Sequence, residues 1–374
     1  MTLAFLAAMR REAFALVLCA CGTSAPATST FDAGRDEVPP ADYSPGPDDA
    51  IDASAPTGVA CTPGSVRVVA TSSKMVFDGP RIDDDFVYWT EGEPSDAGQW
   101  NGSYFGTLAV HRAGKLGEAP TRVFGTSSSI TNVTYGPFFA IDSTSAYFSD
   151  YSGGFGAVVR SNKDGSSSQV LASGLPAPRE LERAGDSIFF TSGTSLYSID
   201  IDGTNERVVD TNWTAREYAV GSTHVYAIDE NGDVVRVSRF GGAVERLVPG
   251  GSGIVHQGLS VGDDGYVYVV ELVEPFGWVK TANVLRVSTD GKTPYVFLHD
   301  VATEFPPGDE LFTTSDGDCL VYSTLQGVFR SCSGGSSAAI GPGHALEAPV
   351  VDATSIYWRT QSQGTTTIYA ACKL

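Results

Sequence analysis

Acids, arginines, a histidine and a glutamine stand just before several of the short β-branched runs in this chain. Such groups could work as general acids and bases, or grip a small polar ligand, if the fold brought them together. They are Asp78, Arg179, Glu180, Arg216, Glu217, His256, Gln257, Asp309, Glu310 and Glu347. Convergence of Asp78, His256 and Glu310 in one pocket would favour an enzyme such as a lyase or hydrolase. The simpler interpretation is a polar channel mouth without chemistry.

No catalytic motif accompanies these residues. The five histidines are isolated, and the chain has no HExxH zinc helix, no GxSxG elbow and no GxxxxGK phosphate loop. Residues 229–233, Asp-Glu-Asn-Gly-Asp, offer oxygen ligands for calcium. However, Asn-Gly between two apolar runs is the pair that a hairpin turn prefers. We therefore predict no catalytic residue, no metal and no cofactor.

Aromatic side chains form a second candidate set, because exposed rings near arginines often anchor protein or glycan interfaces. Residues 91–107 and 271–283 are longer than the equivalent parts of other repeats, which predicts extended loops there. The aromatic candidates are Trp100, Tyr104, Phe105, Tyr151, Phe155, Trp213, Phe276 and Trp278. The alternative is that these rings fold back onto the strands as local cores.

The elements that must position these residues are short strands, since no window from residue 61 onward has the spacing of an amphipathic helix. An apolar residue followed by an aromatic one recurs about every 45 residues, a typical propeller-blade period. These markers begin at Val87, Ala146, Ile188, Val225, Val267, Val321 and Ile356. Further strand-like runs flank each marker, so we predict an all-β, seven-bladed β-propeller of four-stranded antiparallel blades.

The two ends of this domain are predicted to share one blade. The last repeat ends at Leu374 after only three strands, and residues 66–69, Val-Arg-Val-Val, supply a fourth. Pairing of this N-terminal strand with the C-terminal blade closes the ring and removes free sheet edges.

Cysteine spacing fits the same architecture. Cys319 and Cys332 are equidistant from the turn at residues 325–326, so a regular hairpin places them opposite one another. Cys61 precedes the closing strand, and Cys372 ends the strand with which that strand should pair. We predict the disulfides Cys319–Cys332 and Cys61–Cys372 in an exported chain. The alternative is four unpaired buried thiols.

The first sixty residues are typical of an export signal and a tether. Arg10 and Arg11 precede an apolar run that is too short to span a bilayer but typical of a secretory signal. Residues 22–60 are rich in Ala, Pro, Ser and Thr and hold seven acids against one base, so we expect them to stay extended and disordered. The predicted organisation is a signal peptide over 1–21, a tether over 22–60 and the propeller over 61–374.

The charge balance excludes one class of partner. The chain has 44 Asp and Glu residues against 24 Lys and Arg residues, a formal net charge of -20. A nucleic-acid-binding protein needs a basic surface to displace counterions from phosphates, so no nucleic acid partner is expected.

Residues 18–21, Leu-Cys-Ala-Cys, resemble the bacterial lipobox, in which the last cysteine is diacylated and becomes the mature N-terminus. The resemblance implies lipidation of Cys21, attachment to a membrane, and a place in the cell envelope at the outer membrane or facing the periplasm. An ordinary signal peptide cut near Ala25 is the alternative.

The strand Tyr88-Trp89-Thr90-Glu91 and residues 146–171 resemble the YWTD repeats of low-density-lipoprotein-receptor propellers, and residues 196–205 are similar to TolB-type propeller repeats. The likeness covers residues 75–374 and implies an extracytoplasmic, protein-binding propeller. Both families usually have six blades whereas seven are counted here, so no functional residue is carried over.

We therefore expect a lipid-anchored propeller of the cell envelope that binds protein or glycan, or acts as a scaffold, through one face. We call this the loop-rich face: it carries the connections between second and third strands and the segments that lead into each inner strand. The alternatives are an enzyme acting at the channel mouth and a structural envelope protein without a specific ligand.

Overall fold

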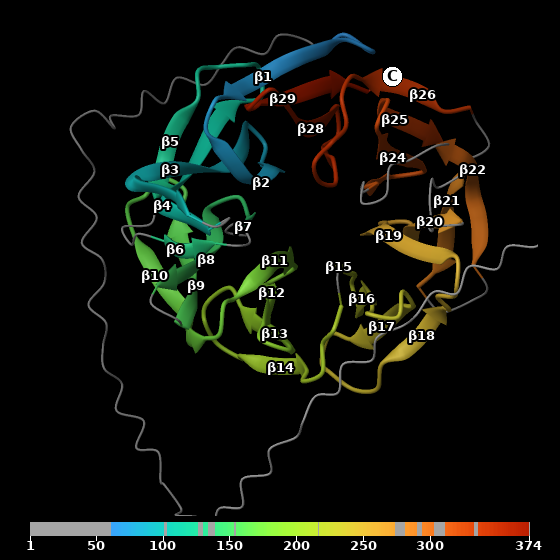
Figure 1. Cartoon of the computed structure of the whole chain (residues 1–374), viewed down its shortest axis with the longest axis horizontal. Helices are drawn as coiled ribbons and strands as arrows, with labels where there is room; N and C mark the ends of the chain where they lie inside the picture. The colour runs from blue at the N-terminus through green and yellow to red at the C-terminus, as the bar shows by residue number, and fades with distance from the viewer. Residues whose placement is uncertain are drawn as a thin grey trace, which may run out of the picture. The chain divides into compact units, whose positions relative to one another are not determined.

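The computed structural model describes residues 61–373, apart from 101–102, 126–129, 134–138, 153–154, 216, 274–280, 290–293, 303–310 and 333–335. The predicted signal peptide and tether, with Cys21, lie outside this part. The described residues form seven antiparallel sheets around a ring, which confirms the predicted seven-bladed β-propeller (Figure 1). They contain no helix, and so none long and apolar enough to cross a membrane.

The blades are numbered in chain order, each running from an inner to an outer strand. Blade 1 has β2 (Met75–Ile82), β3 (Phe86–Trp100), β4 (Ser103–Gly114) and β5 (Thr121–Gly125), with β6 (Ile130–Val133) also paired to β4. Blade 2 has β7 (Phe139–Ile141), β8 (Ser145–Ser152), β9 (Phe155–Asn162) and β10 (Ser168–Leu175). Blade 3 has β11 (Arg179–Ala184), β12 (Ser187–Ser192), β13 (Ser195–Asp200) and β14 (Arg207–Asp210).

The remaining blades follow the same order. Blade 4 has β15 (Glu217–Val220), β16 (His224–Ile228), β17 (Val234–Ser238) and β18 (Glu245–Val248). Blade 5 has β19 (Ile254–Val261), β20 (Tyr266–Val273), β21 (Thr281–Ser288) and β22 (Tyr295–Ala302). Blade 6 has β23 (Thr313–Asp316), β24 (Cys319–Thr324), β25 (Gly327–Cys332) and β26 (Ala338–Gly341). Blade 7 has β27 (Val350–Val351), β28 (Ser355–Ser362), β29 (Thr365–Cys372) and β1 (Val66–Ser72).

The apolar–aromatic markers all lie on second strands and form the core between blades. Tyr147 of blade 2 is fully buried and packs in one cluster with Ile188 and Phe190 of blade 3. Trp89 and Tyr357 likewise share a cluster at the junction of blades 1 and 7. A second strand has a neighbouring strand on both sides and a neighbouring blade on both faces, so its side chains are the ones that the fold buries most completely.

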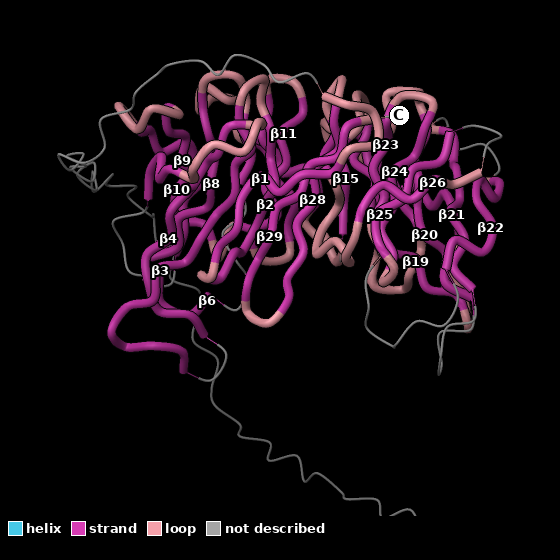
Figure 2. The backbone as a smooth tube through the Cα atoms, turned by 90° about the horizontal axis from the view of Figure 1, so that it is seen from above, coloured by secondary structure: helices cyan, strands magenta, loops and turns pink. Residues whose placement is uncertain are grey.

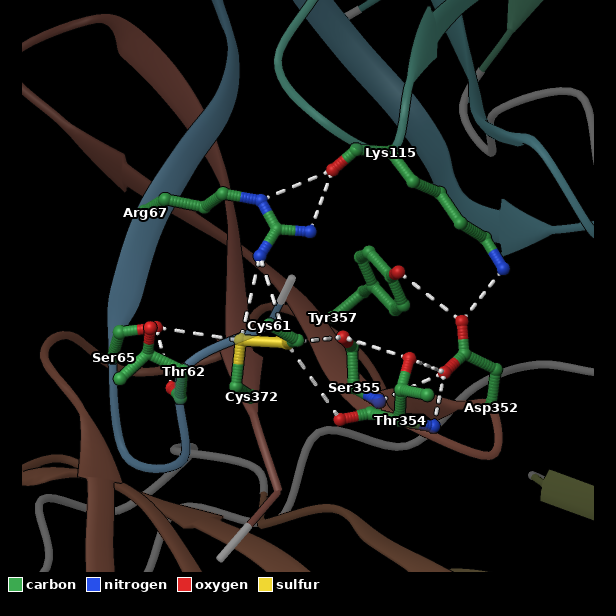
Figure 3. Close-up of a disulfide and its surroundings, with 10 residues drawn as sticks. All are labelled: Cys61, Thr62, Ser65, Arg67, Lys115, Asp352, Thr354, Ser355, Tyr357 and Cys372. Carbon is green, nitrogen blue, oxygen red and sulfur yellow. Dashed lines mark hydrogen bonds and ion pairs between the residues drawn. A yellow bond between two sulfur atoms is a disulfide. The ribbon is translucent and has the colours of Figure 1, made fainter. Parts of the chain in front are cut away.

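The N-terminal strand closes the ring as predicted. Strand β1 is the outermost strand of blade 7 and pairs with β29, where Val66 lies opposite Ala371. The predicted disulfide Cys61–Cys372 joins the same two segments across 311 residues of sequence. Figure 3 shows Arg67 beside this disulfide, and its guanidinium donates from Nη2 to the carbonyl oxygen of Lys115 in blade 1 at 2.6 Å. The seam therefore ties blade 7 to blade 1 as well as closing blade 7.

The second predicted disulfide, Cys319–Cys332, is also present. Its cysteines face each other directly across the β24–β25 hairpin. The register follows from the symmetric spacing of the two cysteines around the turn.

One predicted loop is a pair of strands. Residues 91–107 continue β3 and β4 into a hairpin, paired as far as Trp100 and Ser103, and β6 adds to β4 there. Figure 2 shows this hairpin extending beyond the body of the ring. The prediction of an extended loop was therefore wrong, because continued pairing of β3 with β4, and of β4 with β6, holds this Gly-rich segment as strands. In the other long stretch, β20 continues to Val273 and β21 begins at Thr281, and residues 274–280 lie outside the described part.

On the face opposite the loop-rich face, which we call the short-turn face, an aspartate recurs in the turn between first and second strands. Asp83 accepts hydrogen bonds from the Tyr88 hydroxyl at 2.7 Å and from Nζ of Lys163, in blade 2, at 2.5 Å. Asp352 repeats this arrangement with the Tyr357 hydroxyl at 3.1 Å and with Lys115 at 2.6 Å (Figure 3). Each aspartate thus fixes its own turn and also ties two blades together.

Candidate functional site

Carboxylates on or beside the inner strands join each blade to the next. Asp78 of β2 is 5% exposed, and its Oδ2 accepts the N–H of Phe139 in blade 2 at 2.9 Å. Glu347, just before β27, accepts the N–H of Gly79 in blade 1 through Oε2 at 3.2 Å. Two residues predicted at the channel mouth therefore hold backbone amides of the neighbouring blade.

The same arrangement recurs in blades 3 and 4. Glu182 of β11 accepts the N–H of Val220 at 2.8 Å. Glu217 of β15 accepts the N–H groups of Gly258 and Leu259 in blade 5, at 2.9 and 2.6 Å. Inner strands have no neighbouring strand on the channel side. A carboxylate can accept the hydrogen bonds that the backbone amides of an adjacent inner strand would otherwise lack.

Two arginines accompany the carboxylates at the junction of blades 7 and 1. Arg81 lies 3.1 Å from Asp78 and 3.8 Å from Glu347, measured between guanidinium nitrogen and carboxylate oxygen. Arg359 lies 3.0 Å from Glu347 and donates to the carbonyl oxygen of Val76 at 2.6 Å. Sequence reasoning missed Arg81, Arg359 and Glu182, since no motif marks them and each has a partner in another repeat.

Burial changes the acidity of two of these carboxyls. Burial raises the pKa of Glu182 to about 7, against the opposing effects of the Val220 amide and the Arg81 charge. Burial also raises the pKa of Glu347 to about 8, although Arg359 and Arg81 favour its ionised form. Both groups therefore exchange protons near neutral pH.

His256 belongs to a separate network at the junction of blades 4 and 5. The residue is 4% exposed, and its Nδ1 lies 2.6 Å from the carbonyl oxygen of Gly232. Its Nε2 lies 3.9 Å from the Glu271 carboxylate. Asp78 makes its contacts in blades 1, 2 and 7, so the structure does not bring Asp78 and His256 into one contact set. Glu310, the third member of the predicted constellation, lies outside the described residues, as do Asp309 and Arg216.

A pocket of about 400 Å³ opens on the loop-rich face at blades 3 and 4. Three connections form it: the segment between β10 and β11, the β12–β13 turn, and the segment between β14 and β15. Its lining residues are Pro176, Ala177, Arg179, Glu180, Thr191, Gly193, Trp213 and Ala215. Its volume falls within the usual range for small-ligand sites, and it contains three of the residues predicted at this face.

The pocket walls are held in place by local hydrogen bonds. Ala177 and Glu180 have φ values of 49° and 53°, a left-handed conformation that costs energy for residues other than glycine. The Tyr218 hydroxyl donates to the carbonyl oxygen of Glu180, and the N–H of Gly193 donates to that of Pro176 at 3.0 Å. Backbone strain retained by such contacts is characteristic of functional sites.

Two polar side chains at the pocket differ in how their hydrogen-bonding groups are satisfied. Trp213 is 8% exposed, and its indole Nε1 is buried without a hydrogen-bond partner among the described residues. The Glu180 carboxyl accepts from the Thr191 hydroxyl at 3.3 Å. Burial raises the pKa of Glu180, while Thr191 and Arg179 favour its ionised form.

The aromatic predictions have mixed outcomes. Trp213 is a core residue that packs edge-on against Tyr218, which fits the local-core alternative. Phe155, in the β8–β9 hairpin, is 66% exposed. Trp100, Tyr104 and Phe105 lie on the extended β3–β4 hairpin, and Tyr151 lies on β8. Phe276 and Trp278 lie outside the described residues.

The acidic segment 229–233 forms a hairpin turn. Oδ1 of Asp229 accepts the N–H groups of Asn231 and Asp233, both at 2.9 Å, and Gly232 has a φ of 79°. Within the described part of the chain, no group of three or more His, Cys, Asp or Glu residues could hold a metal ion.

Comparison with known proteins reveals similarity of fold. No protein-family model matches the chain, and no curated protein matches its sequence. Virginiamycin B lyase from Staphylococcus aureus is 15% identical, with a TM-score of 0.56 over 82% of this chain and 98% of that one. YCF48 bound to D1 peptide is 11% identical, with a TM-score of 0.53 over 82% and 94% of the two chains.

An oligogalacturonate lyase in complex with manganese is 9% identical, with a TM-score of 0.50 over 83% of this chain and 98% of that one. These proteins have different activities on one architecture, so the similarity is informative about fold alone. The resemblance of the repeats to other propellers is thereby confirmed at the level of the β-propeller fold.

Proposed function

We propose that this protein is a binding or scaffold module of the cell envelope, exported and anchored through lipid on Cys21, which holds a protein or glycan partner on its loop-rich face. The observation that carries the proposal is the pocket at blades 3 and 4, which is lined by Arg179, Glu180 and Thr191 on the loop-rich face. Two disulfides support an oxidising compartment outside the cytoplasm.

The inner-strand carboxylates favour binding over catalysis. Asp78, Glu182, Glu217 and Glu347 each accept a backbone amide of the next blade. A catalytic acid or base must reach a substrate proton at hydrogen-bond distance. Groups that already hold the ring together are poorly placed to do so.

Capture from native envelope tests the binding function. The full chain, Phe155→Ala and Phe240→Ala are each crosslinked in envelope extracts, because these two phenylalanines are similarly exposed, at 66% and 74%, on opposite faces. A partner that the wild type and Phe240→Ala enrich and Phe155→Ala loses supports the loop-rich face. Equal recovery by all three proteins contradicts it.

Lipid attachment has its own test. Metabolic labelling with palmitate should mark the wild type and leave Cys21→Ala unlabelled in the soluble fraction. Labelling of neither protein, with both soluble, would favour an ordinary signal peptide cut near Ala25.

A propeller enzyme is the second candidate, because the pKa values of Glu182 and Glu347, about 7 and 8, suit general acid–base work near neutral pH. Two of the similar structures are lyases. The rate of a lyase or hydrolase reaction that uses Glu182 or Glu347 should depend on an ionisation near pH 7. Activity that depends on Glu182 should disappear in Glu182→Gln. Incubation with a panel of neutral and uronate-containing oligosaccharides, followed by product analysis, tests it, and absence of product from every member counts against it.

A further inference from the structure

Blade 4 departs from the acidic pattern of the short-turn face. In each of the other six blades, the turn between first and second strands contains at least one aspartate, whereas in blade 4 this turn is Gly221-Ser222-Thr223. The other turn of blade 4 on this face, residues 239–244, has no acid either. In a chain with a net charge of -20, this sector of the face therefore repels an acidic segment less than the neighbouring sectors do.

Arg239 belongs to a set of cations that lie directly after the third strand of a blade. Three members of the set form an ion pair with an aspartate of the preceding blade, and these are Lys115, Lys163 and Lys373. Arg239 has no carboxylate partner among the described residues. Its guanidinium donates to the carbonyl oxygens of Ser222 at 3.3 Å and Ala184 at 2.7 Å. The positive charge of Arg239 is therefore not balanced as those of the three lysines are.

The next residue, Phe240, departs from the repeat as well. At the same turn, blades 2 and 3 have Asp164-Gly165 and Asp202-Gly203, and blade 4 has Phe240-Gly241. The three turns are equivalent, since each glycine has a positive φ and its N–H donates to the carbonyl oxygen three residues earlier. An apolar ring, 74% exposed, thus stands where the other blades have a charged side chain.

Neighbouring side chains extend this feature into a surface that is both basic and apolar. The guanidinium carbon of Arg207 lies 5.0 Å from the centre of the Phe240 ring. Burial and the charge of Arg207 lower the pKa of Arg239, although Asp200 opposes the change, so the two guanidinium groups lie close enough to interact. Val208 follows Arg207, Val244 ends the turn that holds Phe240, and both are exposed. We call this surface the basic–apolar patch: Arg207, Val208, Arg239, Phe240 and Val244.

The chain itself contains a segment of complementary composition next to this face. Residues 40–60 have four acids and no base, and Ile51 lies among these acids, which are Asp42, Asp48, Asp49 and Asp52. The segment leads into Cys61, which is bonded to Cys372 at the short-turn end of β29. An extended chain of about 10–20 residues spans roughly 30–65 Å. A compact body of about 310 residues is roughly 50 Å across, so the acids can reach blade 4.

We propose that residues 42–52 of this chain dock on the basic–apolar patch, with aspartates beside Arg207 and Arg239 and Ile51 against Phe240. An extended segment can make these contacts without forming a helix or strand. Because it belongs to the same chain, its effective concentration is on the order of millimolar, so contacts that would be weak between separate molecules are populated. Docking on the short-turn face leaves the loop-rich face open, and it depends neither on a partner there nor on lipid at Cys21.

Limited digestion of the full chain with a protease that cleaves before aspartate tests the docking. Mass spectrometry gives the cleavage rate at each site, and Asp32 and Asp36, upstream of the docked segment, are internal controls. We expect cleavage before Asp48 and Asp49 to be about fivefold faster in Phe240→Asp than in the wild type, because the protease cuts the undocked form. Sodium chloride at 1 M should bring the wild type close to the variant, since it screens the charges. Cleavage before the upstream pair should not differ.

Phe240→Asp is a conservative way to remove the patch, because it restores the Asp-Gly turn of blades 2 and 3 and should fold. The substitution removes the ring and adds a charge that repels the segment. Leu325→Asp is the matched control, since Leu325 is also exposed but lies in the β24–β25 turn on the loop-rich face. Its cleavage pattern should equal that of the wild type.

Several results would overturn the proposal. Equal cleavage of the wild type and Phe240→Asp would show that the segment does not use the patch. Protection that grows with protein concentration would indicate the segment of a second copy, and protection seen only with vesicles that contain phosphatidylglycerol would indicate a membrane. Protection unchanged at 1 M salt would exclude pairing with the arginines. The capture experiment with Phe155→Ala concerns the other face, so each proposal can fail without the other.

Discussion

The two faces of the propeller use polar residues in different ways. On the short-turn face, an aspartate, a tyrosine hydroxyl and a cation recur around Asp83, Asp264 and Asp352, and the groups satisfy one another. On the loop-rich face, the pocket at blades 3 and 4 has two strained residues and an indole N–H without a partner among the described residues. Polar groups that recur from blade to blade stabilise the ring. Polar groups found at one junction alone mark the place available to a ligand.

Loss of the seam disulfide on the short-turn face should have the largest effect. Cys61→Ser with Cys372→Ser frees a loop of 311 residues, and the chain-entropy model predicts a loss of about 6 kcal/mol of unfolding free energy. Guanidinium unfolding without reductant measures this loss. Cys319→Ser with Cys332→Ser is the matched control, since it opens a loop of only 13 residues and should cost about 3 kcal/mol. Equal costs would show that ring closure does not depend on the seam.

The repeated aspartates allow a comparison within the short-turn face. Asp83 holds Tyr88 and the buried Lys163, whereas Asp142 holds Tyr147 and forms no ion pair among the described residues. Asp83→Asn leaves a buried ammonium without its partner and should cost about 3 kcal/mol. Asp142→Asn should cost about 1 kcal/mol, the value of a single hydrogen bond. Urea unfolding of both variants measures the two losses of unfolding free energy. Similar losses would mean that the ion pair between Asp83 and Lys163 adds nothing to stability.

Acid should lower the unfolding free energy through an aspartate of the short-turn face. Although burial alone would raise it, the pKa of Asp352 is lowered to about 2 by Lys115 and by the amides of Thr354 and Ser355. The carboxylate thus contributes stability above its ordinary pKa that is lost as pH falls toward 2, about 2 kcal/mol in all. Unfolding free energy measured from pH 5 to pH 2 should fall less steeply in Asp352→Asn. An identical pH profile in this variant would contradict the assignment.

Glu347, at the inner strands, should show the opposite pH dependence. Because its pKa rises to about 8 on folding, the folded state binds a proton that the unfolded state releases above its ordinary pKa of 4.5. Unfolding free energy should therefore decrease as pH rises from 5 to 8, by on the order of 3 kcal/mol. Glu347→Gln should flatten this decrease in denaturant titrations. A decrease of the same size in the variant would mean that another group titrates.

The smallest expected change concerns the pocket. Trp213→Phe and Trp358→Phe remove the same atoms, but Trp358 Nε1 donates to the carbonyl oxygen of Pro342 at 3.1 Å, while Trp213 Nε1 has no partner among the described residues. We expect Trp358→Phe to lower the unfolding free energy by about 1 kcal/mol more than Trp213→Phe does. Thermal unfolding of both variants measures it. A larger loss in Trp213→Phe would indicate that its indole N–H supports the fold.

The fold was predictable from the sequence because each blade repeats one short pattern. The markers, the closing strand and both cysteine pairs follow from spacing alone, since strand period and hairpin symmetry fix which residues meet. The β3–β4 hairpin was misread as a loop because sheet pairing beyond the blade has no counterpart in other repeats. Trp213 was predicted as an interface anchor, yet it packs in the core beside the pocket, with its indole N–H buried.

The candidate site was less predictable than the fold. Arg81 meets the Glu347 carboxylate, Glu182 the Val220 amide and Arg359 the Val76 carbonyl oxygen. Each partner belongs to another blade and is far away in sequence. A repeat pattern specifies what one blade contributes to its own sheet. It does not specify which side chains of neighbouring blades meet at the channel.

The seam also decides how the ring would respond to force. The chain upstream of Cys61 enters the propeller at a cysteine that is covalently joined to Cys372 on β29. Tension applied along the N-terminal segment would reach blade 7 through that covalent bond before it could peel β1 from β29. A propeller held from its N-terminal end could thus bear tension without separation of β1 from β29.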